Sequence, residues 1–498
     1  MSRSLALLLG CAALVACSSG EAPRQRAAGG PAIWIRDVTL VSPERTAPLR
    51  HAHVLVRGDR IAWVGASVPP DGQGARVVEG RGRYLVPGLI DGHVHLAMVP
   101  GMSEEQEAAM PAVVDAYFRQ LPRSYLYHGF TTVVDLAVID RARLDAVRSA
   151  PIGPAVLDCG DSLPLVNGYP MQFFPPAVRF RLFPNFLADP RHPGALPAGV
   201  AAADHTPAAA VARVAAGGGI CVKTYVESGF GPDFGKLPTP TVELVRDVVS
   251  AGHAHHLPVL VHANATSAHR VAVDAGVDAV VHGLWNWEAE SEGGEMPAAV
   301  RQVLDDEARA GIAMMPTTRV LGGLEDMFVP AFLAEPALRR VLPADLIAWY
   351  GSEAGRWFAR DLVGPSTPPE RARPLIHQGV IAARAATAYF VSRGGRLVFG
   401  SDTPSAPTYG NPPGYNGYLE LRSLEAAGVA PRQLLDAATR APAALFGVSA
   451  ELGTIEPGKR ARLLLLTADP LASAAAYDTI ELVIMNGRVL PRADLAAP

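Results

Sequence analysis

The chain has 498 residues, a hydrophobic content of 49% and a formal net charge of −4. A length of this order predicts two or three domains, although an α/β barrel of about 250 residues or more can form one unit. The charges are nearly balanced and no basic run of the kind that follows phosphates occurs, so the composition argues against nucleic acid as a partner.

The first residues have the pattern of an export signal. Residues 1–16 begin with a short basic stretch and continue in an apolar run that is too short to span a bilayer as a lasting helix. Cys17 and its neighbours resemble a bacterial lipoprotein lipobox, which implies cleavage before Cys17 and lipid on its sulfur. A plain secretory signal is the alternative, and either kind of signal would export the chain. Residues 17–31 suit a flexible tether, and Ser18 resembles the pattern for sorting to the outer membrane, so we expect membrane anchoring on the exported side.

The four cysteines leave room for one disulfide at most. Cys11 would be removed with the signal and Cys17 would be acylated, so Cys159 and Cys221 remain. No disulfide framework is possible with two cysteines. We expect both to be thiols in the core.

Short β-strands are predicted at both ends of the chain. Residues 32–84 alternate between apolar runs and turns. Residues 447–498 return to short strands, with Asn486-Gly487 between two apolar runs as a strong hairpin signal. We predict that both ends together build one small β-sandwich domain.

Residues 85–446 show the rhythm of an α/β barrel. Apolar strand-like runs alternate with helical segments, which predicts a parallel sheet covered on both sides. The helical pattern is plain at 241–256 and at 267–276, where Gly276 is expected to end the second helix. Eight such runs fit a closed (β/α)₈ TIM barrel. Two long connections, 163–205 and 319–395, follow strands and are interpreted as insertions that shape the substrate site. The eight runs end at His95 or cover 130–135, 154–159, 220–226, 258–264, 279–283, 312–316 and 396–402.

Two histidines close the first of these runs. Side chains alternate along a strand, so His93 and His95 point to the same side and can bind one metal ion. Gly92 lets the backbone pass close to a neighbour, such as a metal or a substrate. The same spacing in His51 and His53 precedes a polar turn, and we interpret that pair as ordinary residues of the sandwich.

Other polar residues stand at the ends of barrel strands. The carboxyl ends of all barrel strands meet at one face, where catalytic residues gather. Each of these residues alone has an ordinary explanation, such as a hydrogen-bonded core histidine or a helix cap, but six at the ends of five strands indicate one site. They are His93, His95, Lys223, His262, His282 and Asp402.

Several motifs carry a resemblance to a known family. The chain resembles the amidohydrolase superfamily from residue 33 to residue 490, and is most similar to the imidazolonepropionase-like and Xaa-Pro dipeptidase-like branch with a lysine on strand four. The matching motifs are the Pro-Gly-Leu-Ile-Asp-Gly-His-Val-His run that ends at His95, the Val-His of strand five, the Val-His-Gly of strand six, Gly400-Ser401-Asp402 and the tail segment 452–461.

The resemblance implies a site with two divalent metal ions. A neutral amine can take up carbon dioxide, and the family implies such a carbamate on Lys223, shared by both ions. The implied ligands of one ion are His93, His95, Lys223 and Asp402, and those of the other are Lys223, His262 and His282. Nitrogen and oxygen ligands favour Zn²⁺, with Mn²⁺, Co²⁺ or Fe²⁺ as alternatives. A hydroxide that bridges the metals would be the nucleophile, and Asp402 would act as general base and then acid.

Further residues are candidates for substrate contacts. Tyr225 lies two residues beyond Lys223 and so faces the same side of the strand. It can donate to an oxyanion or bind a substrate carboxylate, or it can simply fill the barrel. Trp285 and Trp287 form an aromatic wall or pack under a loop. Asn264 and Thr317 are weaker candidates.

These observations predict an amidohydrolase-type enzyme that cleaves the carbon–nitrogen bond of a small amide, such as a dipeptide or an N-acyl amino acid. A metal-dependent deaminase is the nearest alternative, but Ala265 stands three residues after His262, where many deaminases carry a glutamate. A lactone or cyclic-amide hydrolase would use the same metals. A non-catalytic binding protein on a barrel scaffold is disfavoured by the intact set of ligands. Family members often form homo-oligomers.

Overall fold

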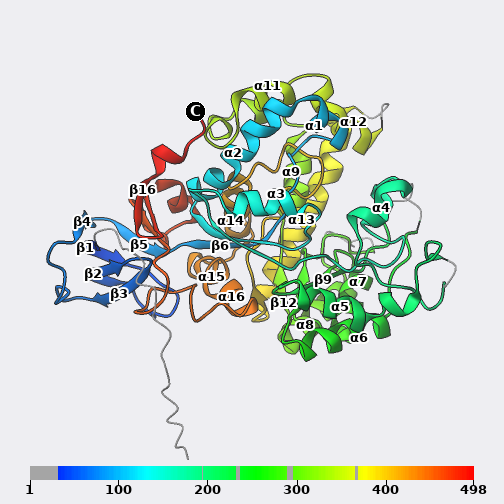
Figure 1. Ribbon diagram of the computed structural model, residues 1–498, viewed down its shortest axis with the longest axis horizontal. Helices are drawn as coiled ribbons and strands as arrows, with labels where there is room; N and C mark the ends of the chain where they lie inside the picture. Colours follow the sequence, from blue (N-terminus) through cyan, green and yellow to red (C-terminus); the bar gives the residue numbers. More distant parts are fainter. Residues whose placement is uncertain (1–31, 193–194, 231–235, 289–294, 365–367) are drawn as a thin grey trace, which may run out of the picture.

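The computed structural model describes residues 32–192, 195–230, 236–288, 295–364 and 368–498. The predicted signal peptide, the tether and Cys17 lie outside the described residues. The strands of the two chain ends, blue and red in Figure 1, lie side by side and apart from the green and yellow part of the molecule. Within the described ranges, no helix combines the length and the apolarity that a membrane span requires.

Strands from both chain ends pair in one sheet. Its order is β16-β15-β14-β5-β1-β2-β3, and β4 pairs with β1. The two chain ends thus share one sheet, and the predicted sandwich stays a prediction. The predicted hairpin is confirmed, because Asn486 and Gly487 connect β15 to β16 with positive φ angles of 51° and 68°. The strands are β1 (Ile33–Leu40), β2 (Leu49–Arg57), β3 (Arg60–Gly65), β4 (Arg76–Glu79), β5 (Tyr84–Pro87), β14 (Leu463–Leu466), β15 (Ile480–Met485) and β16 (Arg488–Pro491).

The middle of the chain holds eight parallel strands, one for each predicted run. They form a three-stranded sheet, β6-β7-β8, and a five-stranded sheet, β13-β12-β11-β10-β9. Almost every residue of these strands is buried, which explains why the runs are apolar throughout. The strands are β6 (Leu89–Val94), β7 (Phe130–Asp135), β8 (Ala155–Asp158), β9 (Val222–Tyr225), β10 (Val259–His262), β11 (Ala279–Val281), β12 (Ala313–Met315) and β13 (Arg396–Leu397).

Backbone hydrogen bonds connect the two parallel sheets at both edges. The amide of Gly92 donates to the carbonyl of Phe399 at 3.0 Å, which joins β6 to the segment after β13. At the other edge, the amide of Leu163 donates to the carbonyl of Lys223 at 2.7 Å. The α/β fold with parallel strands is therefore confirmed. The strands themselves form two sheets and not the single closed sheet that the sequence predicted.

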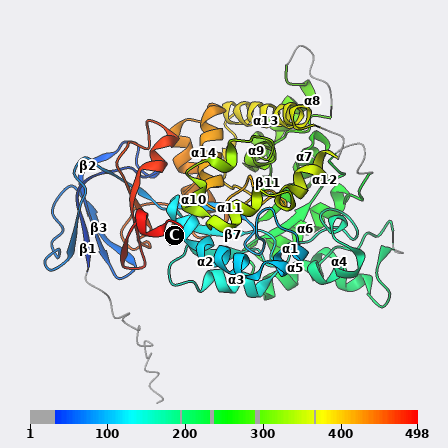
Figure 2. The same cartoon turned by 90° about the horizontal axis from the view of Figure 1, so that it is seen from above.

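Helices surround the parallel strands (Figure 2). The predicted helices at 241–256 and 267–276 are present as α6 and α7, and Gly276 ends α7 with a φ of 74°, as a C-terminal glycine does. The α-helices between strands are α2 (Pro111–Tyr127), α3 (Arg141–Arg148), α5 (Pro207–Ala216), α6 (Val242–Ala254), α7 (Thr266–Ala275), α8 (Ala298–Ala310), α14 (Tyr415–Ala426), α15 (Pro431–Ala437) and α16 (Arg440–Leu445), with the short α1 (Glu104–Ala109) before α2.

Both long connections contain helical structure. The first holds η1 (Met171–Phe173), α4 (Pro176–Leu182) and η3 (Ala202–His205). It has its own small apolar cluster around Met171 and Phe186. The second holds α9 (Arg319–Asp326), η6 (Phe332–Ala334), α10 (Leu338–Val341), α11 (Ala344–Tyr350), η7 (Ala354–Arg356), α12 (Trp357–Val363) and α13 (Pro369–Ser392), and the chain ends with η8 (Ala474–Thr479) and η9 (Arg492–Leu495) around β15 and β16.

The expectation of two free thiols is wrong. Cys159 and Cys221 form a disulfide that joins the end of β8 to the start of β9. Both residues are fully buried, as expected of core residues. Their Cα atoms lie 4.6 Å apart on neighbouring strands, within the range that a disulfide spans. The two cysteines are 62 positions apart in the sequence, so their spacing along the chain does not indicate that they are close in space.

Candidate functional site

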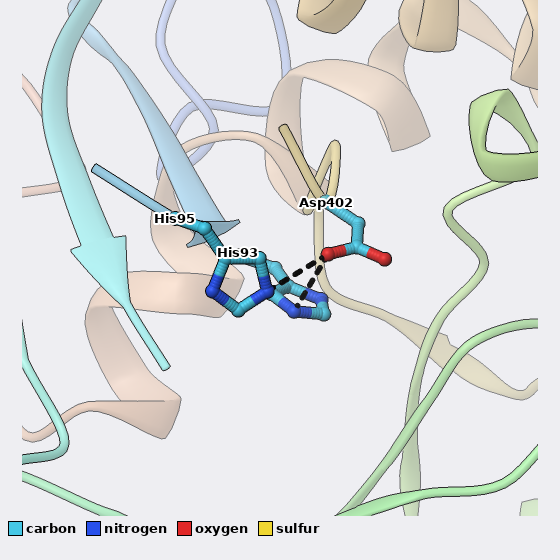
Figure 3. Close-up of side chains that lie close together, drawn as sticks. All are labelled: His93, His95 and Asp402. Carbon is cyan, nitrogen blue, oxygen red and sulfur yellow. Dashed lines mark ion pairs between the residues drawn. The ribbon is translucent and has the colours of Figure 1, made fainter. Parts of the chain in front are cut away.

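Three predicted ligands converge where β6 ends (Figure 3). The Nε2 atoms of His93 and His95 each lie 3.1 Å from Oδ1 of Asp402. One ligand atom from each of the three side chains lies within 4.8 Å of the others, the spacing of groups that share a metal ion. Backbone hydrogen bonds hold the two segments in register, because the amide of Asp402 donates to the carbonyl of His93 at 2.8 Å.

Glycines at this place serve the packing of strands. A Cβ on Gly92 would lie 2.8 Å from the carbonyl oxygen of Phe399, and one on Gly400 would lie 2.8 Å from Cβ of His93. The expectation that Gly92 leaves room for a metal or a substrate is therefore corrected. The close neighbour is the backbone of the adjacent strand, which has to approach for the histidines and Asp402 to meet.

His262 and His282 form the second half of the cluster. Nδ1 of His262 and Nε2 of His282 lie only 2.8 Å apart. The remaining ring nitrogens have other partners: Nε2 of His262 lies 3.2 Å from Oε2 of Glu227, and Nδ1 of His282 lies 2.7 Å from Oγ1 of Thr317. Such outer partners fix the orientation of a ring, so the two facing nitrogens are the ones available to a metal.

Lys223 lies on β9, among these groups. Its side chain is buried, and Nζ has no hydrogen-bond partner among the described residues. Its charge interacts with Asp402 and lowers the pKa of His93. Burial lowers the pKa of Lys223 itself from 10.5 to about 7. A large share of this lysine is therefore a neutral amine at neutral pH, the form that reacts with carbon dioxide.

Burial and neighbouring charges set the ionisation of the other groups. Burial lowers the pKa of His93, His262 and His282 below the ordinary value of 6.5. Burial also disfavours the charged form of Asp402, but a hydrogen bond from His95 and nearby positive charge hold the pKa of Asp402 below 3.8. Neutral imidazoles and an ionised carboxylate are the forms that bind metals, so His93, His262, His282 and Asp402 fit a site for divalent ions. Burial opposes the charged form of His95 as well, but its hydrogen bond to Asp402 raises the pKa of His95, so this histidine would release a proton when a metal binds.

Three residues of this cluster have backbone conformations that ordinary side chains rarely adopt. The φ angles are 91° at His282, 52° at Asp402 and 43° at Thr317. A positive φ costs free energy in residues other than glycine, and such residues gather at functional sites. The surrounding strands hold these three side chains in directions that a regular strand would not give them.

The structure thus brings all six predicted ligands together, and it also places the weaker candidates. Tyr225 lies beside Lys223, with Nζ 5.5 Å from the centre of the tyrosine ring. The ring of Trp285 lies 5.3 Å from that of His282. Trp287 instead packs against the large apolar core. Asn264 donates to Glu227 at 2.6 Å, and Thr317 contacts His282 as described. The roles of these residues stay predictions.

Two acidic residues at the site were not anticipated. Glu227 is buried and follows β9, where a glutamate in a loop usually indicates a solvent-exposed position. Asp91 is buried on β6, and burial raises the pKa of its carboxyl group to about 7. Asp91 accepts hydrogen bonds from the hydroxyl of Ser401 at 2.6 Å and from the amide of Ser401 at 2.9 Å. It therefore ties the strand of His93 to the segment of Asp402.

Comparison with known sequences gives matches along most of the chain. The model of the family described as "Amidohydrolase family" matches residues 84–490. An adenine deaminase of Rubrobacter xylanophilus is 33% identical over 132 residues, which cover 26% of this chain and 20% of that protein. An imidazolonepropionase of Aromatoleum aromaticum is 36% identical over 137 residues, covering 27% of this chain and 32% of that protein. The chain thus spans less than a third of the length of these curated relatives.

Solved structures are similar over nearly the whole chain. A Xaa-Pro dipeptidase with methionine bound in its active site has a TM-score of 0.60 at 19% identity, and the match covers 92% of this chain and all of that one. A putative prolidase from Bifidobacterium longum has a TM-score of 0.60 at 23% identity, covering 92% and 94%. A molinate hydrolase has a TM-score of 0.64 at 18% identity, covering 93% and 95%. At these identities the likeness shows a shared fold.

Proposed function

Because the chain belongs to the amidohydrolase family, we propose that it is a metal-dependent hydrolase that cleaves the carbon–nitrogen bond of a small amide, in a dipeptide or an N-acyl amino acid. The match to the family model confirms the predicted family. The proposal of this reaction rests on one observation: four histidines, Lys223 and the carboxylate of Asp402 gather in one cluster in which all but the partly exposed His95 are buried, and neighbours fix the rings of two of the histidines. We also infer that the two parallel sheets form one barrel.

The donor set suits two divalent ions. His93, His95 and Asp402 would hold one ion, and His262 and His282 a second, with a carbamate on Lys223 shared by both. Nitrogen and oxygen ligands favour Zn²⁺. When bound, the ions would lower the pKa of water and polarise the carbonyl of the amide. The buried Nζ of Lys223 and the buried Nδ1 of His93 have no partner among the described residues, and the unpartnered amine supports a modified lysine.

Asp402 has the properties of the group that moves the proton. Its pKa is held low, so it is a carboxylate at neutral pH and can accept a proton from the attacking water. Protonated, it can deliver the proton to the leaving nitrogen. Tyr225 and Trp285 flank the cluster from β9 and from the segment after β11, and we propose that they contact the substrate.

We further propose that the protein is exported and that lipid on Cys17 anchors it to the outer membrane. The disulfide between Cys159 and Cys221 supports export, because disulfides persist in oxidising compartments and are rare in the bacterial cytosol. Labelling with a radioactive or alkyne-bearing fatty acid tests the anchor. We expect label on the wild-type chain and none after Cys17→Ser.

The decisive experiment combines metal content with turnover. Protein lacking residues 1–16 is loaded with Zn²⁺ and bicarbonate, its metal is counted by mass spectrometry, and cleavage of dipeptides and N-acyl amino acids is followed. We expect about two ions per chain and amide cleavage. We expect Asp402→Asn to lower kcat at least about a hundredfold, because the general base is lost. Asp305→Asn, which alters a surface carboxylate paired with Arg393, is the control.

The partial likeness to an adenine deaminase favours one alternative function, release of ammonia from a ring amine. The same preparation distinguishes the two reactions. Ammonia release from adenine with one metal per chain would overturn the proposed amide hydrolysis. A fully active Asp402→Asn enzyme would overturn the proposed role of Asp402.

A further inference from the structure

A group of aromatic rings packs against the metal-site histidine His262. Tyr169, from the insertion after β8, lies at its centre, with its ring 4.4 Å from the ring of His262 and 5.5 Å from that of Tyr225. Phe173 and Phe230 contact Tyr169 edge-on at 5.6 and 5.5 Å. The rings thus form a continuous apolar path from the ligand cluster outwards, and sequence reasoning had not identified Tyr169, Phe173 or Phe230.

The outer end of this path is exposed to solvent. Phe173 is 47% exposed and Phe230 is 46% exposed, and their rings lie 6.1 Å apart in a stacked arrangement. Large hydrophobic side chains with this much exposure are few among the described residues, and these two are the only aromatic ones. The others are Val68, Val77, Leu375 and Ile381. Exposed apolar surface next to a functional site commonly binds an apolar part of a ligand.

We propose that the amide substrate carries an aromatic or similarly large apolar group beside the scissile bond, and that this group packs against Phe173 and Phe230. The inference rests on the proposed function and adds the substrate class to it. Tyr169 contacts both exposed phenylalanines and also His262. A group that covers the phenylalanines is therefore separated from the ligand cluster only by the ring of Tyr169, which favours a part of the substrate as the group that binds there.

The chemistry of the path favours an uncharged group. The path presents aromatic ring faces, from Tyr169 beside His262 to the exposed Phe173 and Phe230. The carboxylate of Glu227, beside this part of the site, is already engaged by Asn264 and His262. A phenyl group would gain contacts with the two exposed rings and remove their apolar surface from water.

The test compares substrates that differ only in the size of one group. The metal-loaded protein is given N-acetylalanine and N-benzoylalanine, and the dipeptides Ala-Ala, Phe-Ala and Ala-Phe, which place a ring on either side of the bond. Cleavage gives kcat/KM, and calorimetric titration measures binding whether or not turnover occurs. We expect at least about a tenfold preference for a ring-bearing compound, from the apolar area that it would bury.

Variants locate this preference. The double substitution Phe173→Ala with Phe230→Ala is expected to abolish the tenfold preference in KM and in affinity, while the metal content stays at the wild-type value. The matched control removes two other exposed apolar side chains, Leu375→Ala with Ile381→Ala on α13, and is expected to keep the preference. Circular dichroism verifies that both variants fold.

The outcomes separate the two proposals. Equal binding of ring-bearing and aliphatic compounds by the wild type would overturn the inference and leave amide hydrolysis standing. The same holds for a preference that survives the double substitution. Preferential binding of the ring-bearing compounds without any cleavage would support the inference about the ligand and overturn the proposed hydrolysis.

Discussion

His262 and His282 face each other through one ring nitrogen and meet a neighbour through the other. Glu227 accepts from Nε2 of His262, and Thr317 contacts Nδ1 of His282. A histidine that donates from one nitrogen keeps the lone pair of the other for a metal. The position of the proton on His262 is thus determined by a carboxylate that is itself held by Asn264 and by the amide of Gly229.

Glu227→Gln tests this arrangement. Glutamine keeps only one acceptor oxygen for the three donors that Glu227 now serves, so at least one of the contacts to His262, Asn264 and the amide of Gly229 is lost and the orientation of His262 is weakened. We expect the affinity for the second metal to fall about 10- to 100-fold, with the first metal retained. Competition with a chelator measures both affinities. Glu243→Gln, at the exposed start of α6, is the control. An unchanged second affinity would show that Glu227 does not orient His262.

The sequence identifies some of these residues and not others for a physical reason. The six predicted ligands each interrupt or close an apolar strand, where a polar side chain is unusual, so the pattern of the sequence indicates them. Glu227 and Tyr169 lie in loops after strands, where polar and aromatic residues are common. Their position beside His262 depends on how the loops fold, and the spacing of residues along the chain does not indicate it.

Among the elements, β8 and β9 are connected by a covalent bond, the disulfide between Cys159 and Cys221. The disulfide between them closes a loop that contains the whole of the first insertion, and Cys221 lies two residues before Lys223. The crosslink limits the unfolded chain most when the loop is long. The disulfide therefore fixes β9, the strand that carries Lys223, to the neighbouring strand β8.

The change of Cys159 and Cys221 to serine measures this contribution. We expect the free energy of unfolding to fall by about 3–4 kcal/mol, the loss of loop-closure entropy for a loop of this size. Denaturant titration in oxidising buffer gives the value, and the wild type in reducing buffer should match the variant. An oxidised wild type no more stable than the variant would contradict the crosslink.

The first insertion is also held by charge. Asp189 accepts from Arg191, whose guanidinium donates as well to the carbonyl of Thr239, and from His192. The hydrogen bond from Arg191, with that from His192, holds the pKa of Asp189 well below 3.8 against the opposing effect of burial. The folded state therefore binds fewer protons than the unfolded chain, and stability rises with pH through this window.

Asp189→Asn should reveal that dependence. Above about pH 5 we expect the wild type to be more stable than the variant by a constant amount, and the difference should shrink as pH falls below about 4. Urea unfolding at a series of pH values gives both curves. Asp204→Asn, on η3 of the same insertion, is the control. A difference that does not change with pH would mean that the ion pair contributes nothing to folding.

At the level of elements, prediction succeeds where the pattern is local. Eight apolar runs give eight strands, and Gly276 ends its helix as expected. The pairing of the cysteines and the division of the strands into two sheets depend on approach between distant segments. At the chain ends, the short strands are found where the pattern predicts them, and both ends contribute to one sheet.

For the whole molecule, the joint between the two parts lies next to the ligands. β5 pairs with β14 in the sheet of the chain ends, and after Gly88 the chain enters β6, which carries His93. A Cβ at Gly88 would lie 2.1 Å from Oγ1 of Thr131, so the joint is closely packed. Movement of the end sheet against the parallel strands would therefore disturb the position of His93.

The pairing of the two ends also has a consequence for how the chain reaches its folded state. β14 lies between β5 and β15 in the sheet. Arg60 donates a hydrogen bond to the carbonyl of Gly458, which is 398 positions later in the sequence. During synthesis or transport across a membrane the early strands emerge first and have no partner on that side until the last tenth of the chain arrives. Contacts over such separations form slowly. An interrupted chain would therefore expose the open edge of β5, a surface that chaperones and proteases can recognise before any defective enzyme accumulates.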